Sequence, residues 1–127
     1  MIELNFAHLC DYASLSEGGK VNILGIFSNI NVSNFPYKHS QMYIVVNIFV
    51  GKSGKYRQTV KLIKKDAPEQ IKEVSELNIE AKNMGNVGFI NKLDNIVFEK
   101  PGEYEFQIYI NDSIKSIKTI PLSLILK

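Results

Sequence analysis

Residues 102–127 read GEYEFQIYINDSIKSIKTIPLSLILK, and they carry the clearest indication of the fold class. Apolar and polar side chains alternate from Tyr104 to Ile110. Asn111-Asp112 then interrupts the alternation, and a second, largely apolar run spans residues 114–126. A period of two, broken by two residues that tolerate a left-handed backbone, is typical of an antiparallel β-hairpin with one solvent-facing side. We therefore expect the chain to end in such a hairpin and to consist of β-strands.

The same pattern recurs along the whole chain. Residues 21–30 are apolar on both faces, which is typical of a central strand. Residues 68–75 fit either a short helix begun by Pro68 or a strand, and we favour a strand from about Ser75 because its surroundings are β. Seven or eight short strands predict a single domain over residues 1–127, an all-β, antiparallel two-sheet β-sandwich of immunoglobulin-like or C2-like order. The expected strands cover residues 2–10, 21–30, 42–50, 56–65, 75–82, 89–98, 104–110 and 114–126.

Composition narrows the class of protein. The chain has 127 residues, of which 45% are hydrophobic and 22% charged, as expected of one globular domain. Its net charge is +2 and Arg57 is its one arginine, which disfavours nucleic-acid binding because phosphate contacts need a concentrated basic face. Cys10 is the one cysteine, so no intramolecular disulfide can form. The first residues do not resemble a signal peptide and no long apolar segment follows, so we expect a cytoplasmic protein without membrane contact.

Few residues of the chain are suited to metal binding or nucleophilic catalysis. His8 and Cys10 lie two residues apart on one strand face, and with His39 they could ligate zinc. A structural zinc site needs four ligands at close spacing, so we expect no metal and no cofactor. Cys10, His39 and either Asp11 or Asp66 could form a nucleophilic set, but Cys10 is predicted to face inward, whereas a reactive thiol needs exposure. We expect a protein that is not an enzyme, and a hydrolase is the third hypothesis.

A basic segment gives the clearest candidate for ligand binding. No acidic residue occurs from Lys52 to Lys65, and acidic residues follow between Asp66 and Glu80. Two solvated, solubilising faces are the more common interpretation of such a pattern. The alternative is a small anionic, nucleotide-like ligand that the protein sequesters without turnover, with lysine and arginine near its phosphates and one tyrosine stacked on its base. The candidate ligand-binding residues are His39, Lys52, Lys55, Tyr56 and Arg57.

Five segments of the chain form a recognisable set: Leu9–Ala13, Gly19–Phe27, Phe35-Pro36 with His39, Gly102–Phe106 and Pro121-Leu122. Together they resemble a family of small bacterial proteins of unknown function. The resemblance spans nearly the whole chain and corresponds to a bacterial or phage source. It implies a compact immunoglobulin-like or C2-like sandwich, and it brings no activity, cofactor or catalytic residue with it.

The leading hypothesis is a non-enzymatic binding or interaction module. Phe35 and Tyr37 flank Pro36, and they form either an exposed tip that anchors a partner or a plug for the open end of the sandwich. Exposed edge strands can pair with another copy, so we expect a homo-oligomer. The alternative is the small anionic ligand binder described above.

Overall fold

The computed structural model describes residues 1–127 and contains nine β-strands and no helix. Accordingly, no helix of the length and apolar character needed to cross a membrane is present. The strands are β1 (Ile2–Leu15), β2 (Val21–Ile26), β3 (Asn29–Val32), β4 (Tyr37–Val50), β5 (Gly54–Lys64), β6 (Ala67–Ala81), β7 (Gly85–Phe98), β8 (Gly102–Ile110) and β9 (Lys118–Leu126).

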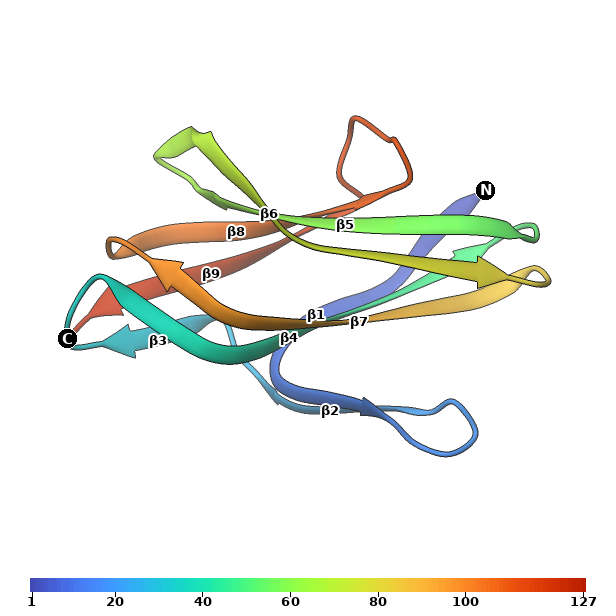
Figure 1. The fold of residues 1–127 in the computed structure, drawn as a ribbon, viewed down its shortest axis with the longest axis horizontal. Coiled ribbons are helices and arrows are strands. Elements are labelled where there is room, and N and C mark those ends of the chain that lie inside the picture. Colours follow the sequence, from blue (N-terminus) through green and yellow to red (C-terminus); the bar gives the residue numbers. More distant parts are fainter.

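The strands form two sheets that pack face to face (Figure 1). One sheet has four strands in the order β2-β1-β4-β7, and the other has five in the order β3-β9-β8-β5-β6. All neighbouring strands are antiparallel except β3 and β9, which are parallel. The prediction of an all-β protein with two sheets is confirmed, although the chain has nine strands and one parallel pair.

The main core lies between the sheets and consists of 23 buried residues. In β8 the predicted alternation is confirmed, because Tyr104, Phe106, Ile108 and Ile110 are buried while the residues between them are half-buried. The final hairpin pairs β8 with β9, but β9 begins only at Lys118. The expected two-residue turn is therefore part of a longer connection, since residues 113–117 follow Asn111-Asp112 without entering the sheet.

A buried amide cluster joins the two sheets through this core. Gln58 of β5 and Asn91 of β7 are fully buried and exchange two hydrogen bonds of 2.9 and 2.7 Å. Asn91 Nδ2 also donates to the carbonyl of Ile44, and the hydroxyl of Ser75 donates to Asn91 Oδ1. Every polar atom of the Asn91 side chain is thus paired, as buried polar groups require. The cluster ties β5 and β6 to the opposite sheet.

Two segments differ from their predicted structure. Residues 21–30 do not form one central strand, because β2 and β3 lie at the edges of different sheets. Gly25 has a φ of +71°, which interrupts the regular extension of β2 one residue before its end at Ile26. Residues 68–75 lie inside β6, a single strand that begins at Ala67. Pro68 is tolerated there because β6 is an edge strand, where a missing amide costs no sheet hydrogen bond on the solvent side.

The chain forms an apolar ribbon, residues 11–26, outside the two layers. Residues 2–10 of β1 pair with β4, whereas residues 10–15 pair with β2. Figure 1 shows the corresponding bend in β1, beyond which the ribbon projects beneath the four-stranded sheet. The underside of the ribbon packs on the outer face of that sheet through a second cluster, in which Val21 and Ile23 cover four buried residues. Those four are Cys10, Ala13, Tyr43 and Val45.

Candidate functional site

Strands β5 and β6 form a charged ribbon, residues 54–81, whose positive and negative charges face each other. The register sets Lys55 opposite Glu80 and Lys61 opposite Glu73. Opposite charges on directly facing residues of two strands stabilise the pairing modestly. The basic segment and the acidic segment that follows it are therefore neighbours in space, and much of the positive charge expected to attract an anion is balanced locally.

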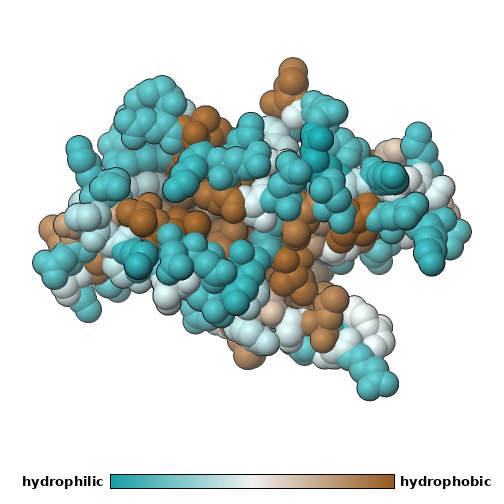
Figure 2. All heavy atoms as spheres, in the orientation of Figure 1, coloured by the Kyte–Doolittle hydropathy of each residue, from teal (hydrophilic) through white to brown (hydrophobic).

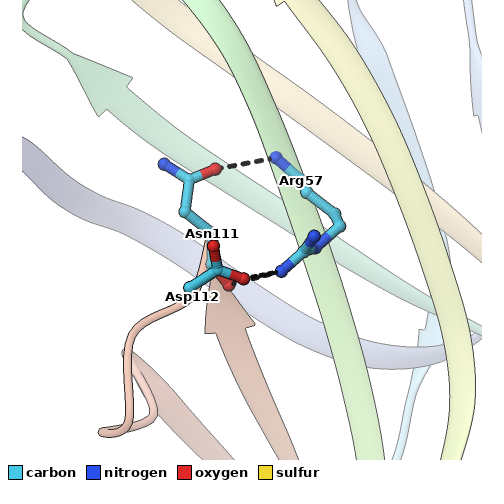
Figure 3. A network of polar contacts seen from close by, with 3 residues as sticks. All are labelled: Arg57, Asn111 and Asp112. Atoms are coloured by element: carbon cyan, nitrogen blue, oxygen red, sulfur yellow. Dashed lines mark hydrogen bonds and ion pairs between the residues drawn. The ribbon is translucent and has the colours of Figure 1, made fainter.

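Arg57 of the charged ribbon is bound to the connection that follows β8 (Figure 3). Its amide donates to Asn111 Oδ1 at 3.0 Å, and the amide of Asn111 donates back to the carbonyl of Arg57 at 2.7 Å. Its guanidinium forms an ion pair with Asp112, and this hydrogen-bonded carboxylate raises the pKa of Arg57 above its ordinary value. Asn111 has a φ of +57°, so this contact holds a left-handed turn in place.

The other candidate ligand-binding residues do not form one site with Arg57, because Tyr56 is buried and His39 lies elsewhere. Tyr56 is buried and its hydroxyl donates to the carbonyl of Lys52 at 2.8 Å, which leaves no open ring face for a stacked base. Lys52 and Lys55 are exposed near the β4–β5 turn. His39 lies at the other end of β4, near its first residue (Figure 1). The structure thus groups Lys52, Lys55, Tyr56 and Arg57 at one end of the sandwich and separates them from His39.

His39 belongs to an aromatic group at the root of the apolar ribbon. The Tyr37 hydroxyl and His39 Nδ1 are hydrogen-bonded at 2.7 Å, and the Phe27 ring lies 6.2 Å from the His39 ring between centroids. Burial lowers the pKa of His39 below 6.5, outweighing the opposite effect of the Asp11 charge. Phe35 and Tyr37 are half-buried and pack on the main core. That arrangement is the one expected of a plug at the end of the sandwich.

Cys10 and His8 have ordinary structural surroundings. The Cys10 thiol is buried and donates to the carbonyl of Tyr43 at 3.7 Å. Burial raises the pKa of this thiol, which disfavours the nucleophilic thiolate. The His8 ring stacks on Phe6 with 5.7 Å between centroids. No three histidine, cysteine, aspartate or glutamate side chains come close enough together to hold a metal ion.

A cleft of about 640 Å³, which no sequence pattern predicted, lies beside the β5–β6 turn. Lys64, Lys72 and Lys100 line it together with two carboxylates, Asp66 and Glu99. Lys64 Nζ lies 2.6 Å from Asp66 Oδ1, and this hydrogen bond lowers the pKa of Asp66. Its three lysines come from β5, β6 and the β7–β8 turn, so only the folded chain brings them together.

The outward face of the apolar ribbon carries a group of neighbouring, exposed apolar side chains. Leu24 is 62% exposed and Ile26 61%, and Tyr12, which faces Leu24 across the ribbon, is 45% exposed. Figure 2 shows hydrophobic atoms along the ribbon at the lower edge of the molecule, between the body of the sandwich and the paler ribbon tip. Neighbouring exposed apolar residues of this kind mark surfaces that contact another molecule.

Comparison with known proteins gives the chain a family. A model described as a family of unknown function, DUF6941, matches residues 5–124. The chain belongs to this family. The resemblance to a family of unknown function is therefore confirmed, and no curated protein matches this DUF6941 chain.

Solved structures share the architecture of this DUF6941 protein at low sequence identity. A GH3 β-glucosidase of Bifidobacterium adolescentis has a TM-score of 0.59 and 8% identity over 98% of this chain and 17% of its own. The β-glucosidase EmGH1 of Erythrobacter marinus has a TM-score of 0.63 and 9% identity over 98% of this chain and 15% of its own. The alkylpurine DNA glycosylase AlkC of Pseudomonas fluorescens, bound to DNA, has a TM-score of 0.54 and 8% identity over 98% of this chain and 30% of its own. These likenesses show a shared fold alone, because the sequence identities are 9% or lower. The chain spans less than a third of the length of each of these proteins.

Proposed function

We propose that this DUF6941 protein is a non-enzymatic interaction module that contacts a protein partner through the outward face of the apolar ribbon. The observation that carries the proposal is the exposure of Leu24 and Ile26 beside Tyr12. Covering exposed leucine and isoleucine side chains with a partner stabilises the complex by about 25 cal/mol per Å² of apolar surface removed from water. Tyrosine supplies contact area at little cost in side-chain entropy, which is why it is frequent in interfaces.

The position of the ribbon supports this proposal. It projects beneath the four-stranded sheet, so a partner reaches it without disturbing the main core (Figure 1). Its underside packs on the second buried cluster, which holds the backbone of the ribbon against the four-stranded sheet. Rigid presentation of a contact surface lowers the entropy lost on binding.

Site-specific photocrosslinking in the expressing cell tests this proposal. A benzophenone amino acid at position 24 or 26 should give protein adducts of higher mass, because both side chains point into solvent on the ribbon. The matched control is the same probe at position 69, an exposed glutamate of the charged ribbon, which should give none. Equal adducts at 24 and 69, or none at 24 and 26, would contradict the proposal.

The type of β-sandwich and the cellular compartment are also part of this proposal. We infer that the sandwich is of the immunoglobulin-like or C2-like type and that the module acts in the cytoplasm. Its single cysteine supports the second point, because a domain without disulfides suits a reducing compartment. Both fold types present loops and edges on a rigid scaffold, which suits a binding role.

Binding of a small anionic ligand is the second candidate function, and the lysine-lined cleft is the observation that favours it. Two of its residues, Lys72 and Lys100, are exposed and their lysine charges are not paired within hydrogen-bond distance. Titration calorimetry with ATP as the probe tests it: Lys72→Ala with Lys100→Ala should weaken binding at least tenfold without lowering the melting temperature. Lys52→Ala with Lys55→Ala is the control pair. A loss of binding in the control pair alone would indicate that the anion binds at the β4–β5 turn. Absence of ATP binding by the unmodified protein would reject this candidate function.

A further inference from the structure

The strand β2 has a free edge. It is the outermost strand of the four-stranded sheet and pairs only with β1. The amide of Ser16 donates to the carbonyl of Lys20 at 2.7 Å, so residue 20 directs its backbone toward β1. Hydrogen-bonding direction alternates along an antiparallel strand, so the amides and carbonyls of Val21 and Ile23 point away from β1. They form a row of backbone donors and acceptors without a protein partner.

This edge also lacks charge. No aspartate, glutamate, lysine or arginine occurs from Val21 to Tyr37. The opposite edges of the two sheets are different, because charged exposed side chains occur along both of them. Charged side chains on an edge strand keep other strands from pairing with it. The charged residues at those edges are Glu69, Lys72, Glu73, Glu76 and Glu80 of β6 and Lys92 and Asp94 of β7.

The remaining edge, β3, is uncharged as well but is protected in another way. It has only four residues, and very short edge strands offer little to pair with. The amide of Lys127 donates to the carbonyl of Val32 at 3.0 Å, so the end of the chain lies alongside this strand on its paired side. Among the four edge strands, β2 is therefore the one that is uncharged and still long enough to pair with another strand.

We propose that β2 pairs antiparallel with β2 of a second copy of this chain, about a two-fold axis. This inference rests on the proposed function and names the partner of the apolar ribbon. A two-fold contact brings identical strands together, and like charges on facing strands repel. An uncharged strand avoids that repulsion, whereas a charged partner strand would find no opposite charge on β2. The chemistry of this edge therefore matches β2 itself.

Pairing of the two ribbons also joins their outward faces. Residues that face each other across an antiparallel pair lie on the same side of the sheet. Leu24 of one copy therefore lies on the same side as Leu24 of the partner, so the two exposed patches adjoin and each covers part of the other. The backbone hydrogen bonds give the contact its direction, and the neighbouring side chains shield those bonds from water.

Native mass spectrometry and sedimentation over a range of concentrations test the inference. The unmodified protein should form a species of twice the 14.4 kDa chain mass. Val21→Pro removes an amide that points to the partner, and Asn22→Lys places a charge on an exposed position of the edge. Each change occurs twice in a two-fold dimer, so each should raise the dimer Kd at least tenfold. The control is Asn78→Lys on β6, the same substitution at an edge that already carries charge, which should leave the Kd unchanged.

Hydrogen exchange keeps the test independent of folding. The amide of Ile23 should exchange about tenfold more slowly in the dimer than in dilute protein, while core amides of β4 exchange equally in both. A dimer that persists in Val21→Pro and Asn22→Lys would overturn β2 pairing. A protein that stays monomeric while a probe at position 24 crosslinks a different protein would overturn the second copy as partner and leave the proposed function standing. A monomer whose probes at positions 24 and 26 give no adduct would overturn both.

Discussion

The charged ribbon and the apolar ribbon are both hairpins at the margin of the sandwich, yet their outer strands expose different kinds of side chain to solvent. In the charged ribbon, lysines of β5 lie opposite glutamates of β6, and the outer strand carries charge along its length. In the apolar ribbon, β2 carries no charge and exposes Leu24 and Ile26. The charged ribbon is therefore complete as a solvated edge, whereas the apolar ribbon has the chemistry of a surface that a partner covers.

The two ribbons also differ in how they are attached. The charged ribbon is bound to the opposite sheet through Gln58, Ser75 and Asn91, a fully hydrogen-bonded cluster inside the main core. The apolar ribbon packs on the outside of its sheet through a cluster of only four buried residues. Local stability follows the amount of buried apolar contact, so we expect the apolar ribbon to open more readily than the charged one.

The largest effect is expected from Asn91→Ala, which breaks the attachment of the charged ribbon. The change leaves the buried amide of Gln58 without its partner and creates a small cavity. Each unsatisfied buried group costs about 1–3 kcal/mol, so we expect a loss of about 3 kcal/mol in the free energy of unfolding. Urea denaturation measures it. The control is Asn78→Ala at an exposed position of β6, which should cost less than about 0.5 kcal/mol; similar losses for both variants would contradict this account of the cluster.

Sequence periodicity was sufficient for the fold class and for most strands. The alternation in β8 and the apolar run of β4 both correspond to buried strands of the main core. Periodicity failed at residues 21–30, because an apolar strand that packs on the outer face of a sheet has the same pattern as a central strand. The available signal was that Leu9 and Cys10 are adjacent and both apolar. Leu9 is buried in the main core and Cys10 in the second cluster, so both faces of β1 are covered at this point.

The candidate site depended on contacts that one sequence does not specify. The basic and acidic segments were visible, but only the register of β5 and β6 shows that Lys55 lies opposite Glu80. The lysine-lined cleft combines residues from three separate segments, so no local pattern could predict it. The exposure of Leu24 and Ile26 could not be predicted from the sequence either, because leucine and isoleucine are usually buried.

A smaller effect is expected from Gly25→Ala in the apolar ribbon. Gly25 has a φ of +71°, a left-handed conformation that costs other residues about 1–2 kcal/mol, and an added Cβ would overlap the carboxylate of Asp11. We expect a loss of about 1–2 kcal/mol, measured by urea denaturation, with faster hydrogen exchange in residues 11–26 and unchanged exchange in residues 54–81. Asp11→Ala with Gly25→Ala removes the overlap and leaves the backbone strain. Full recovery in that double variant would show that the overlap alone matters.

Arg57→Ala should have a smaller effect still and should act on the other side of the comparison. The ion pair with Asp112 is solvent-exposed, with 39% and 90% of the two side chains accessible, so it contributes little to overall stability. The expected result is a slightly lower melting temperature at low salt, with the difference shrinking in 1 M salt, where the screening length is about 3 Å. Arg57→Lys keeps the charge but loses the bond to the carbonyl of Asn111, so it separates charge from geometry. A large, salt-independent loss for Arg57→Ala would show that the guanidinium positions the turn by more than charge.

The smallest effect concerns pH, which should separate the two ribbons. Burial lowers the pKa of His39 below 6.5, so unfolded chains bind the proton more strongly, and stability at the root of the apolar ribbon is full above pH 6.5 and lost as pH falls through the folded pKa. Lys64 lowers the pKa of Asp66 below 3.8, so that contribution to the charged ribbon is lost only under more acidic conditions. Residue-resolved hydrogen exchange, corrected for intrinsic rates, should therefore show residues 11–26 opening first on acidification. His39→Gln should remove this early step, and a step that survives the substitution would assign it to another group.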